Sequence, residues 1–169
     1  MKRIFTLLAC ALPLVTASCG YKLGGLVNGD MEGMKTFDIT MFENQTNYPH
    51  VAMQMTTALA DALQSDGTFR LVSPSKSDFT VSGKVTSVQA RSLTTNPDDS
   101  YLSLEIGLEV HVAYTITDRK TGRTIKTGTV NGEGSYFNTP GNVQAAREAA
   151  LSYAARLAAH ELVDELTIP

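Results

Sequence analysis

The sequence has 169 residues, which is enough for one domain with a sizeable hydrophobic core and short for two. Its hydrophobic fraction of 43% and its charged fraction of 18% exclude an intrinsically disordered chain. The net charge is −3, and it becomes −5 without residues 1–18 because Lys2 and Arg3 are then lost. Such an acidic chain does not attract nucleic acid through its overall field.

The N-terminus has the pattern of a secretory signal peptide. Lys2 and Arg3 precede a mostly apolar run over residues 4–17, which is too short to span a bilayer. The small residues 16–18 then stand directly before Cys19, an arrangement that resembles the lipobox of bacterial lipoproteins. We therefore expect residues 1–18 to be removed and Cys19 to be acylated, which would anchor the chain to a membrane. By the same resemblance, Gly20 favours export to the outer membrane.

Two alternatives concern the cleavage site. Residues 7–9 before Cys10 also resemble a lipobox, but cleavage there would leave only about six residues of the apolar region, below the usual minimum. An ordinary signal peptide would be cut after Ala17, following the pattern Val15-x-Ala17. If cleavage precedes Cys19, the only cysteine left carries lipid, and neither a disulfide nor a cysteine metal site remains.

The first elements follow a tether. Residues 19–34 form this lipidated tether, because they are rich in glycine and weakly patterned. Partial alternation predicts a strand over residues 35–42. Apolar residues at helical spacing predict a helix over residues 48–65, capped by Thr46 or Asn47, with Pro49 in its first turn and a stop at Gly67.

The pattern in the second half of the chain predicts several strands and a final helix. Strands are expected over residues 69–72, 78–91, 102–117 and 124–137. A change of parity predicts a β-bulge near Thr86 or Ser87, and strict alternation makes 102–117 the clearest strand. Residues 118–123 form the turn of a hairpin. A last helix over 143–166 should bury a stripe of Val143, Ala146, Ala150, Leu151, Ala154, Leu157, Ala158 and Leu162.

This order of elements predicts an α+β fold. One strand face is apolar and two helices are available to cover it, so a two-layer sandwich is the economical solution. We expect residues 35–169 to form a single domain with a mostly antiparallel or mixed sheet of four to five strands and both helices packed on one face. The other sheet face would be open to water or to a partner.

The sequence offers little chemistry for catalysis. His50, His111 and His160 have no cysteine or carboxylate at a metal-ligand spacing. The pair Gly132-x-Gly134 precedes no helix, so it does not read as a phosphate-binding loop. We therefore expect no enzyme activity, no metal and no cofactor.

Basic residues are the remaining candidates for a site. Arg119, Lys120 and Arg123 cluster in one turn, while Arg91 lies on a strand. Arginine and lysine pair with phosphate, so these side chains are candidates for contact with an anionic lipid. The alternative is the ordinary charge of a solvated turn and edge strand.

The whole mature chain resembles the LptE-type lipopolysaccharide-assembly lipoproteins. The resemblance rests on the order and spacing of several short segments: Cys19 to Leu23, Phe42 to Thr46, Leu59 to Leu63 with Gly67, Arg70 to Val72, Asp78 to Gly83 with Val85, and Arg147 to Leu151.

The resemblance implies a role without catalysis. Lipoproteins of this type sit inside an outer-membrane β-barrel of LptD type, act as its plug and assembly factor, and can bind lipopolysaccharide. It implies an outer-membrane lipoprotein, lipid-anchored on the periplasmic side, that assists lipopolysaccharide transport to the cell surface. A rival resemblance is to periplasmic lipoproteins that activate a peptidoglycan synthase through protein contact, and a third class is an independent lipid-binding lipoprotein.

Overall fold

The computed structural model describes residues 31–96 and 99–167. Cys10, Cys19 and the signal peptide and tether predicted for the N-terminus lie outside these residues, apart from the end of the tether. The elements in chain order are β1 (Thr36–Ile39), β2 (Glu43–Asn44), α2 (Val51–Asp66), β3 (Arg70–Leu71), the 3-10 helix η3 (Pro74–Lys76), β4 (Phe79–Asn96), β5 (Asp99–Asp118), β6 (Thr124–Phe137) and α3 (Val143–Thr167).

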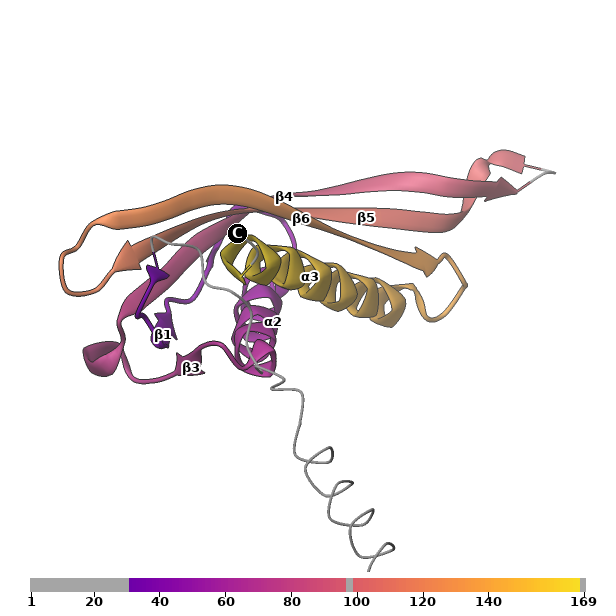
Figure 1. Ribbon diagram of the computed structural model, residues 1–169. Helices are drawn as coiled ribbons and strands as arrows, with labels where there is room; N and C mark the ends of the chain where they lie inside the picture. The colour runs from indigo at the N-terminus through magenta and orange to yellow at the C-terminus, as the bar shows by residue number, and fades with distance from the viewer. Residues whose placement is uncertain (1–30, 97–98, 168–169) are drawn as a thin grey trace, which may run out of the picture.

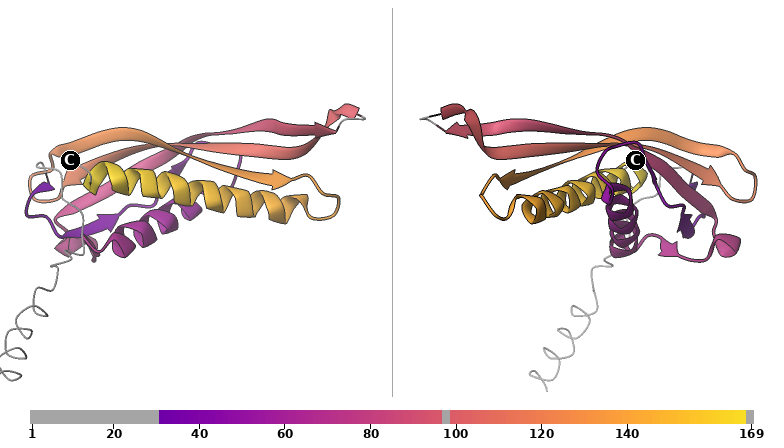
Figure 2. Two further views of the ribbon diagram at one scale, coloured as in Figure 1. Left: turned by 45° about the vertical axis from the view of Figure 1, so that its right-hand side comes forward. Right: turned by 180° about the vertical axis from the view of Figure 1, so that it is seen from behind.

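The strands form one mixed, open sheet in the order β3-β1-β4-β5-β6, with β2 pairing with β4 as well. The pairs β1–β3, β1–β4 and β2–β4 are parallel, whereas β4, β5 and β6 form an antiparallel meander. Both helices lie on the same face of this sheet, and α2 crosses α3 (Figures 1 and 2). The predicted α+β two-layer sandwich is therefore confirmed, with the short β2 as an additional strand.

The long hairpins follow the alternation in the sequence. Every second residue of β5 from Leu108 to Ile116 is buried, and the register of β4 against β5 shifts between Val85 and Ser87, where the bulge was expected. Both strands extend further than predicted. Because β6 ends with Phe137 opposite Glu105, the distal parts of β4 and β5 project beyond it as a two-stranded arm (Figure 1).

The C-terminal end of α2 was predicted correctly, but its N-terminal end was not. Gly67 ends the helix with φ +78°, a conformation that glycine adopts without strain. The helix begins at Val51, three residues later than expected. Asn44 and Thr46 stabilise the preceding turn instead: the Asn44 side-chain oxygen accepts the Thr46 backbone N–H at 2.9 Å, and the Thr46 hydroxyl accepts that of Tyr48 at 3.1 Å.

Small residues let α3 lie very close to β6. A Cβ added at Gly132 would collide with the carbonyl oxygen of Ala154 and come 2.7 Å from the backbone nitrogen of Ala158. One at Gly134 would collide with the carbonyl oxygen of Ala150. These two glycines therefore serve helix–sheet packing.

The predicted stripe of α3 is buried only from Ala150 onwards and without Leu157, because Val143 and Ala146 are half-buried. Leu157 is 39% exposed, while the alanines 155 and 159 are fully buried in its place. The close approach to β6 selects small side chains for the contact and leaves the larger leucine facing outwards.

A polar cluster fastens the end of α3 to the sheet. The buried Tyr114 of β5 donates its hydroxyl to Glu165 at 2.5 Å, and Lys126 of β6 approaches the same carboxylate at 3.1 Å. Burial, followed by the Glu165 carboxylate, raises the pKa of Tyr114 well above its usual value. The tyrosine therefore stays protonated and acts as a donor at neutral pH.

Candidate functional site

The candidate surface is the sheet face that carries no helix (Figures 1 and 2). On β5 this face consists of the odd-numbered residues, because the even-numbered residues from Leu108 to Ile116 point into the core. The neighbouring strands contribute mainly hydroxyl and charged side chains: Ser82, Lys84, Gln89 and Arg91 from β4, and Thr127, Thr129, Asn131, Glu133 and Ser135 from β6. A face of this composition is suited to water or to a polar partner.

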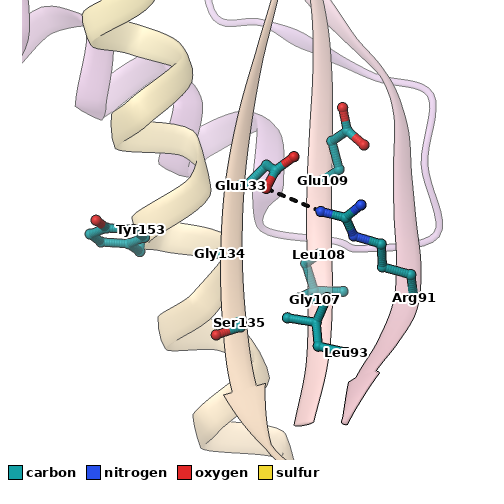
Figure 3. Close-up of a pocket in the computed structure, with 9 residues that line it drawn as sticks. All are labelled: Arg91, Leu93, Gly107, Leu108, Glu109, Glu133, Gly134, Ser135 and Tyr153. Atoms are coloured by element: carbon teal, nitrogen blue, oxygen red, sulfur yellow. Dashed lines mark hydrogen bonds and ion pairs between the residues drawn. The ribbon is translucent and has the colours of Figure 1, made fainter.

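Arg91 lies on this face and is already paired. Its guanidinium crosses β5 to reach Glu133 of β6, with an Nη2–Oε2 distance of 3.2 Å (Figure 3). Gly107 stands opposite Arg91 in the register, and the side chain of Leu93 lies over this glycine. The two side chains are 61% and 58% exposed, so the pair is solvated and contributes at most about 1 kcal/mol.

The turn between β5 and β6 positions the other three candidates, Arg119, Lys120 and Arg123, which we call the basic turn. One carboxylate oxygen of Asp118 accepts the backbone N–H groups of Lys120 at 2.8 Å and of Thr121 at 2.9 Å. The hydrogen bond from the Thr121 backbone is the largest of several effects that lower the pKa of Asp118. The turn is thereby held in one shape, with its basic side chains exposed.

Within the basic turn, Lys120 differs from the two arginines. Its ammonium lies 3.4 Å from Asp78, a carboxylate that also accepts the backbone N–H groups of Lys35 and Thr36 and the Thr36 hydroxyl. These hydrogen bonds, with that from Lys35 the largest, lower the pKa of Asp78 to about 2 against a smaller opposing effect of burial. Asp78 is therefore ionised at neutral pH and offsets the charge of Lys120.

The two arginines of the basic turn remain open to a ligand. Arg119 and Arg123 are exposed, and neither forms an ion pair with a carboxylate among residues 31–96 and 99–167. The structure thus assembles the turn that the sequence predicted and separates it from Arg91. Gly107 faces Arg91, while the turn follows Asp118, and at about 3.3 Å per residue the two lie roughly 35 Å apart along β5.

The histidines do not form a cluster. His50 precedes α2, His160 lies on the exposed side of α3, and His111 lies on the open sheet face, with its Nε2 3.6 Å from Glu109. Within the described part of the chain, no three residues of the metal-ligating types come together. No helix in that part is long and apolar enough to cross a membrane.

Comparison with known sequences identifies the family. Residues 34–166 match the sequence profile LptE, described as lipopolysaccharide-assembly. The chain belongs to the LptE family. No curated protein sequence matches it. The LptE profile spans β1 to α3, so it includes the whole sandwich and both candidate regions. LptE proteins are non-catalytic lipoproteins, and membership supports a role in lipopolysaccharide assembly.

Solved structures share the fold at low sequence identity. A Caulobacter crescentus protein classed as a lipoprotein is 16% identical, with a TM-score of 0.54 over 78% of this chain and 87% of its own. PelC from Paraburkholderia phytofirmans, solved as a dodecamer, is 15% identical, with a TM-score of 0.53 over 85% and 95%. A Xanthomonas campestris protein is 11% identical, with a TM-score of 0.54 over 87% and 92%. The LptE chain therefore has a sandwich that recurs in diverged proteins.

Proposed function

We propose that this LptE chain is an outer-membrane lipoprotein that plugs and helps to assemble an LptD-type β-barrel and assists lipopolysaccharide transport to the cell surface. The observation that carries the proposal is the family match over nearly the whole domain. The polar, helix-free sheet face supports it, because the interior of a large outer-membrane barrel is polar.

The proposal includes an arrangement of the whole chain. Residues 1–18 are a lipoprotein signal peptide, residues 19–34 are a tether acylated at Cys19, and residues 35–169 are the domain described above. Several acyl chains, each contributing about 0.8 kcal/mol per buried methylene, would hold the domain permanently at the periplasmic side of the outer membrane.

Co-purification tests the proposal. The lipidated full chain, extracted from outer membranes in mild detergent, is expected to bring down one outer-membrane barrel at equal stoichiometry. The alternative to exclude is an activator of a peptidoglycan synthase, because this chain also resembles lipoproteins of that kind. Recovery of a penicillin-binding protein without any barrel would refute the proposed function.

The basic turn is our proposed contact for lipopolysaccharide phosphates, and Arg91 is the weaker candidate because Glu133 already pairs with it. Replacing both Arg119 and Arg123 by alanine is expected to weaken binding of purified lipopolysaccharide about tenfold, since each exposed ion pair contributes up to about 1 kcal/mol. Arg91→Ala is expected to have a smaller effect. The measurement is fluorescence titration at two salt concentrations, because screening should reduce the difference.

The control for this prediction is Lys84→Ala, which removes one exposed positive charge from the middle of the open sheet face. It is expected to bind lipopolysaccharide like the unchanged protein. An equal loss of binding free energy for each charge removed, by Lys84→Ala and by the arginine variants, would mean that only net charge matters, and the assignment of the basic turn would be wrong.

A further inference from the structure

One edge of the sheet is β6, and alternate residues of this strand direct their backbone groups away from β5. Asn131 shows which ones: its N–H donates to the Glu161 carboxylate of α3 at 2.8 Å, so it does not point towards β5. Because the register continues without a shift from Asn131 to Phe137, Glu133 and Ser135 have the same orientation. Their N–H and C=O groups therefore face the open edge.

The first half of this edge, residues 124–131, and its second half, residues 132–137, differ in how well side chains protect the backbone from pairing with another strand. In the first half, Glu161 covers the Asn131 N–H, and Lys126 folds back onto α3, donating to the Glu165 carbonyl oxygen at 2.8 Å. Such charged side chains block the pairing of another strand with an exposed edge. Beside Glu133 and Ser135, no described side chain of α3 makes an equivalent hydrogen bond to the backbone of β6.

A groove runs along the unprotected half. It lies between the end of β6 and the first turns of α3, and it is lined by Ser135, Phe137, Ala146, Ala149, Tyr153 and Arg156 among others. The alanines leave room beside the strand, while Phe137 is 66% and Tyr153 49% exposed at its sides. Figure 3 shows Tyr153 on the side of β6 that faces away from β5.

We infer that this groove binds an extended segment of a partner protein, which adds to the sheet as a further strand beside β6. A strand edge running next to a helix offers backbone hydrogen bonds on one side and side-chain contacts on the other, as peptide-binding domains that use strand addition do. The N–H and C=O groups of Glu133 and Ser135 provide the backbone hydrogen bonds. The side-chain contacts come from Ala146, Ala149 and Tyr153.

The groove also indicates the chemistry of the segment. Side chains that point towards Ala146 and Ala149 should be apolar and fit the space that alanines leave. Arg156 lies over the Tyr153 ring, 5.5 Å from its centroid, and has no ion-pair partner in the part of the chain that the structure describes. An acidic residue in the segment would complement it.

A second copy of this chain fits the edge less well than a short segment. Two β6 strands pairing along their length would bring the first half of each edge, with Glu161 and Lys126, against the other copy. The inference holds for any partner that offers such a segment, so it does not depend on the barrel proposed above.

The test uses the lipidated full chain in its native cells, with the photo-cross-linker p-benzoylphenylalanine in place of Phe137, an exposed aromatic side chain at the side of the groove. One adduct is expected, and mass spectrometry should map it to an extended segment of another protein. Ser135→Pro removes one outward N–H and no bond to β5, and edge strands tolerate proline. It should reduce the adduct about tenfold, because one backbone hydrogen bond is lost and the incoming strand is displaced.

Ser135→Ala is the matched control, because it removes the hydroxyl bonded to Glu105 and keeps the backbone N–H. Ser135→Ala should leave the amount of adduct unchanged. Thermal unfolding should show that both variants are folded. If Ser135→Pro does not fold, amide exchange of the unchanged chain decides: Glu133 and Ser135 should be protected in the isolated assembly and exchange freely in the protein alone. No adduct, an adduct insensitive to Ser135→Pro, an adduct with a second copy or with this chain itself, or unprotected amides would each overturn the inference.

Discussion

Gly132→Ala is expected to destabilise the domain by about 3 kcal/mol, and Gly132→Val by more. The added Cβ would occupy the space of the Ala154 carbonyl oxygen and lie 2.7 Å from the Ala158 nitrogen, and both are backbone atoms of a helix that cannot move alone. Because α3 covers β6 along its length, relieving the collision means lifting the helix off the sheet (Figure 2). Thermal unfolding should show a midpoint lower by about 10 °C.

Gly107→Ala is the control for this prediction. It is also a glycine within a long strand, but its added Cβ would meet only atoms of the flexible Leu93 side chain, at 3.1 to 3.2 Å. We expect a change of less than about 1 kcal/mol, since the leucine can rotate and alanine loses less chain entropy than glycine on folding. Equal destabilisation by both substitutions would show that close packing of α3 on Gly132 is not the cause.

Cys19→Ala is expected to abolish acylation and to leave in the outer-membrane fraction only the chain that is bound to the barrel. The thiol is the proposed site of the lipid, and the only other attachment proposed for the chain is its contact with the barrel. Without acyl chains the domain loses an anchor worth about 0.8 kcal/mol for every buried methylene. Metabolic labelling with palmitate, followed by membrane fractionation, measures both effects.

Cys10→Ala provides the comparison, because the residues before Cys10 also resemble a lipobox. It should leave labelling and fractionation unchanged, and the mature N-terminus should begin at an acylated Cys19. If Cys10→Ala abolished labelling and Cys19→Ala did not, the cleavage site would be the earlier one. An unmodified N-terminus after Ala17 would instead indicate plain secretion.

The fold was readable from the sequence where the pattern was strong and local. The structure confirms three such predictions: a strand from the alternation within 102–117, a β-bulge from the parity change near Thr86, and a helix end at Gly67. The extension of β4 to Asn96 was missed, because serine and threonine in its last part show no alternation and the strand depends on pairing with β5. The start of α2 was misjudged because local hydrogen bonds of Asn44 and Thr46 compete with helix capping.

The basic residues of the candidate site could be predicted from the sequence, but the carboxylates that pair with them could not. The clustering of Arg119, Lys120 and Arg123 within one turn follows from the sequence alone. The neutralising partners are distant in the chain: Glu133 meets Arg91 only through the register of three strands, and Asp78 meets Lys120 where β4 begins beside the end of β5. For the same reason, the groove beside β6 could not be predicted from the sequence, because it depends on the path of α3.

The most direct measurement for the proposed function is the amount of lipopolysaccharide on the cell surface after depletion of this LptE chain. We predict that newly made lipopolysaccharide fails to reach the surface and accumulates in inner membranes, while the incorporation of labelled precursors into peptidoglycan is unchanged at early times. Unchanged surface lipopolysaccharide together with reduced peptidoglycan synthesis would contradict the account.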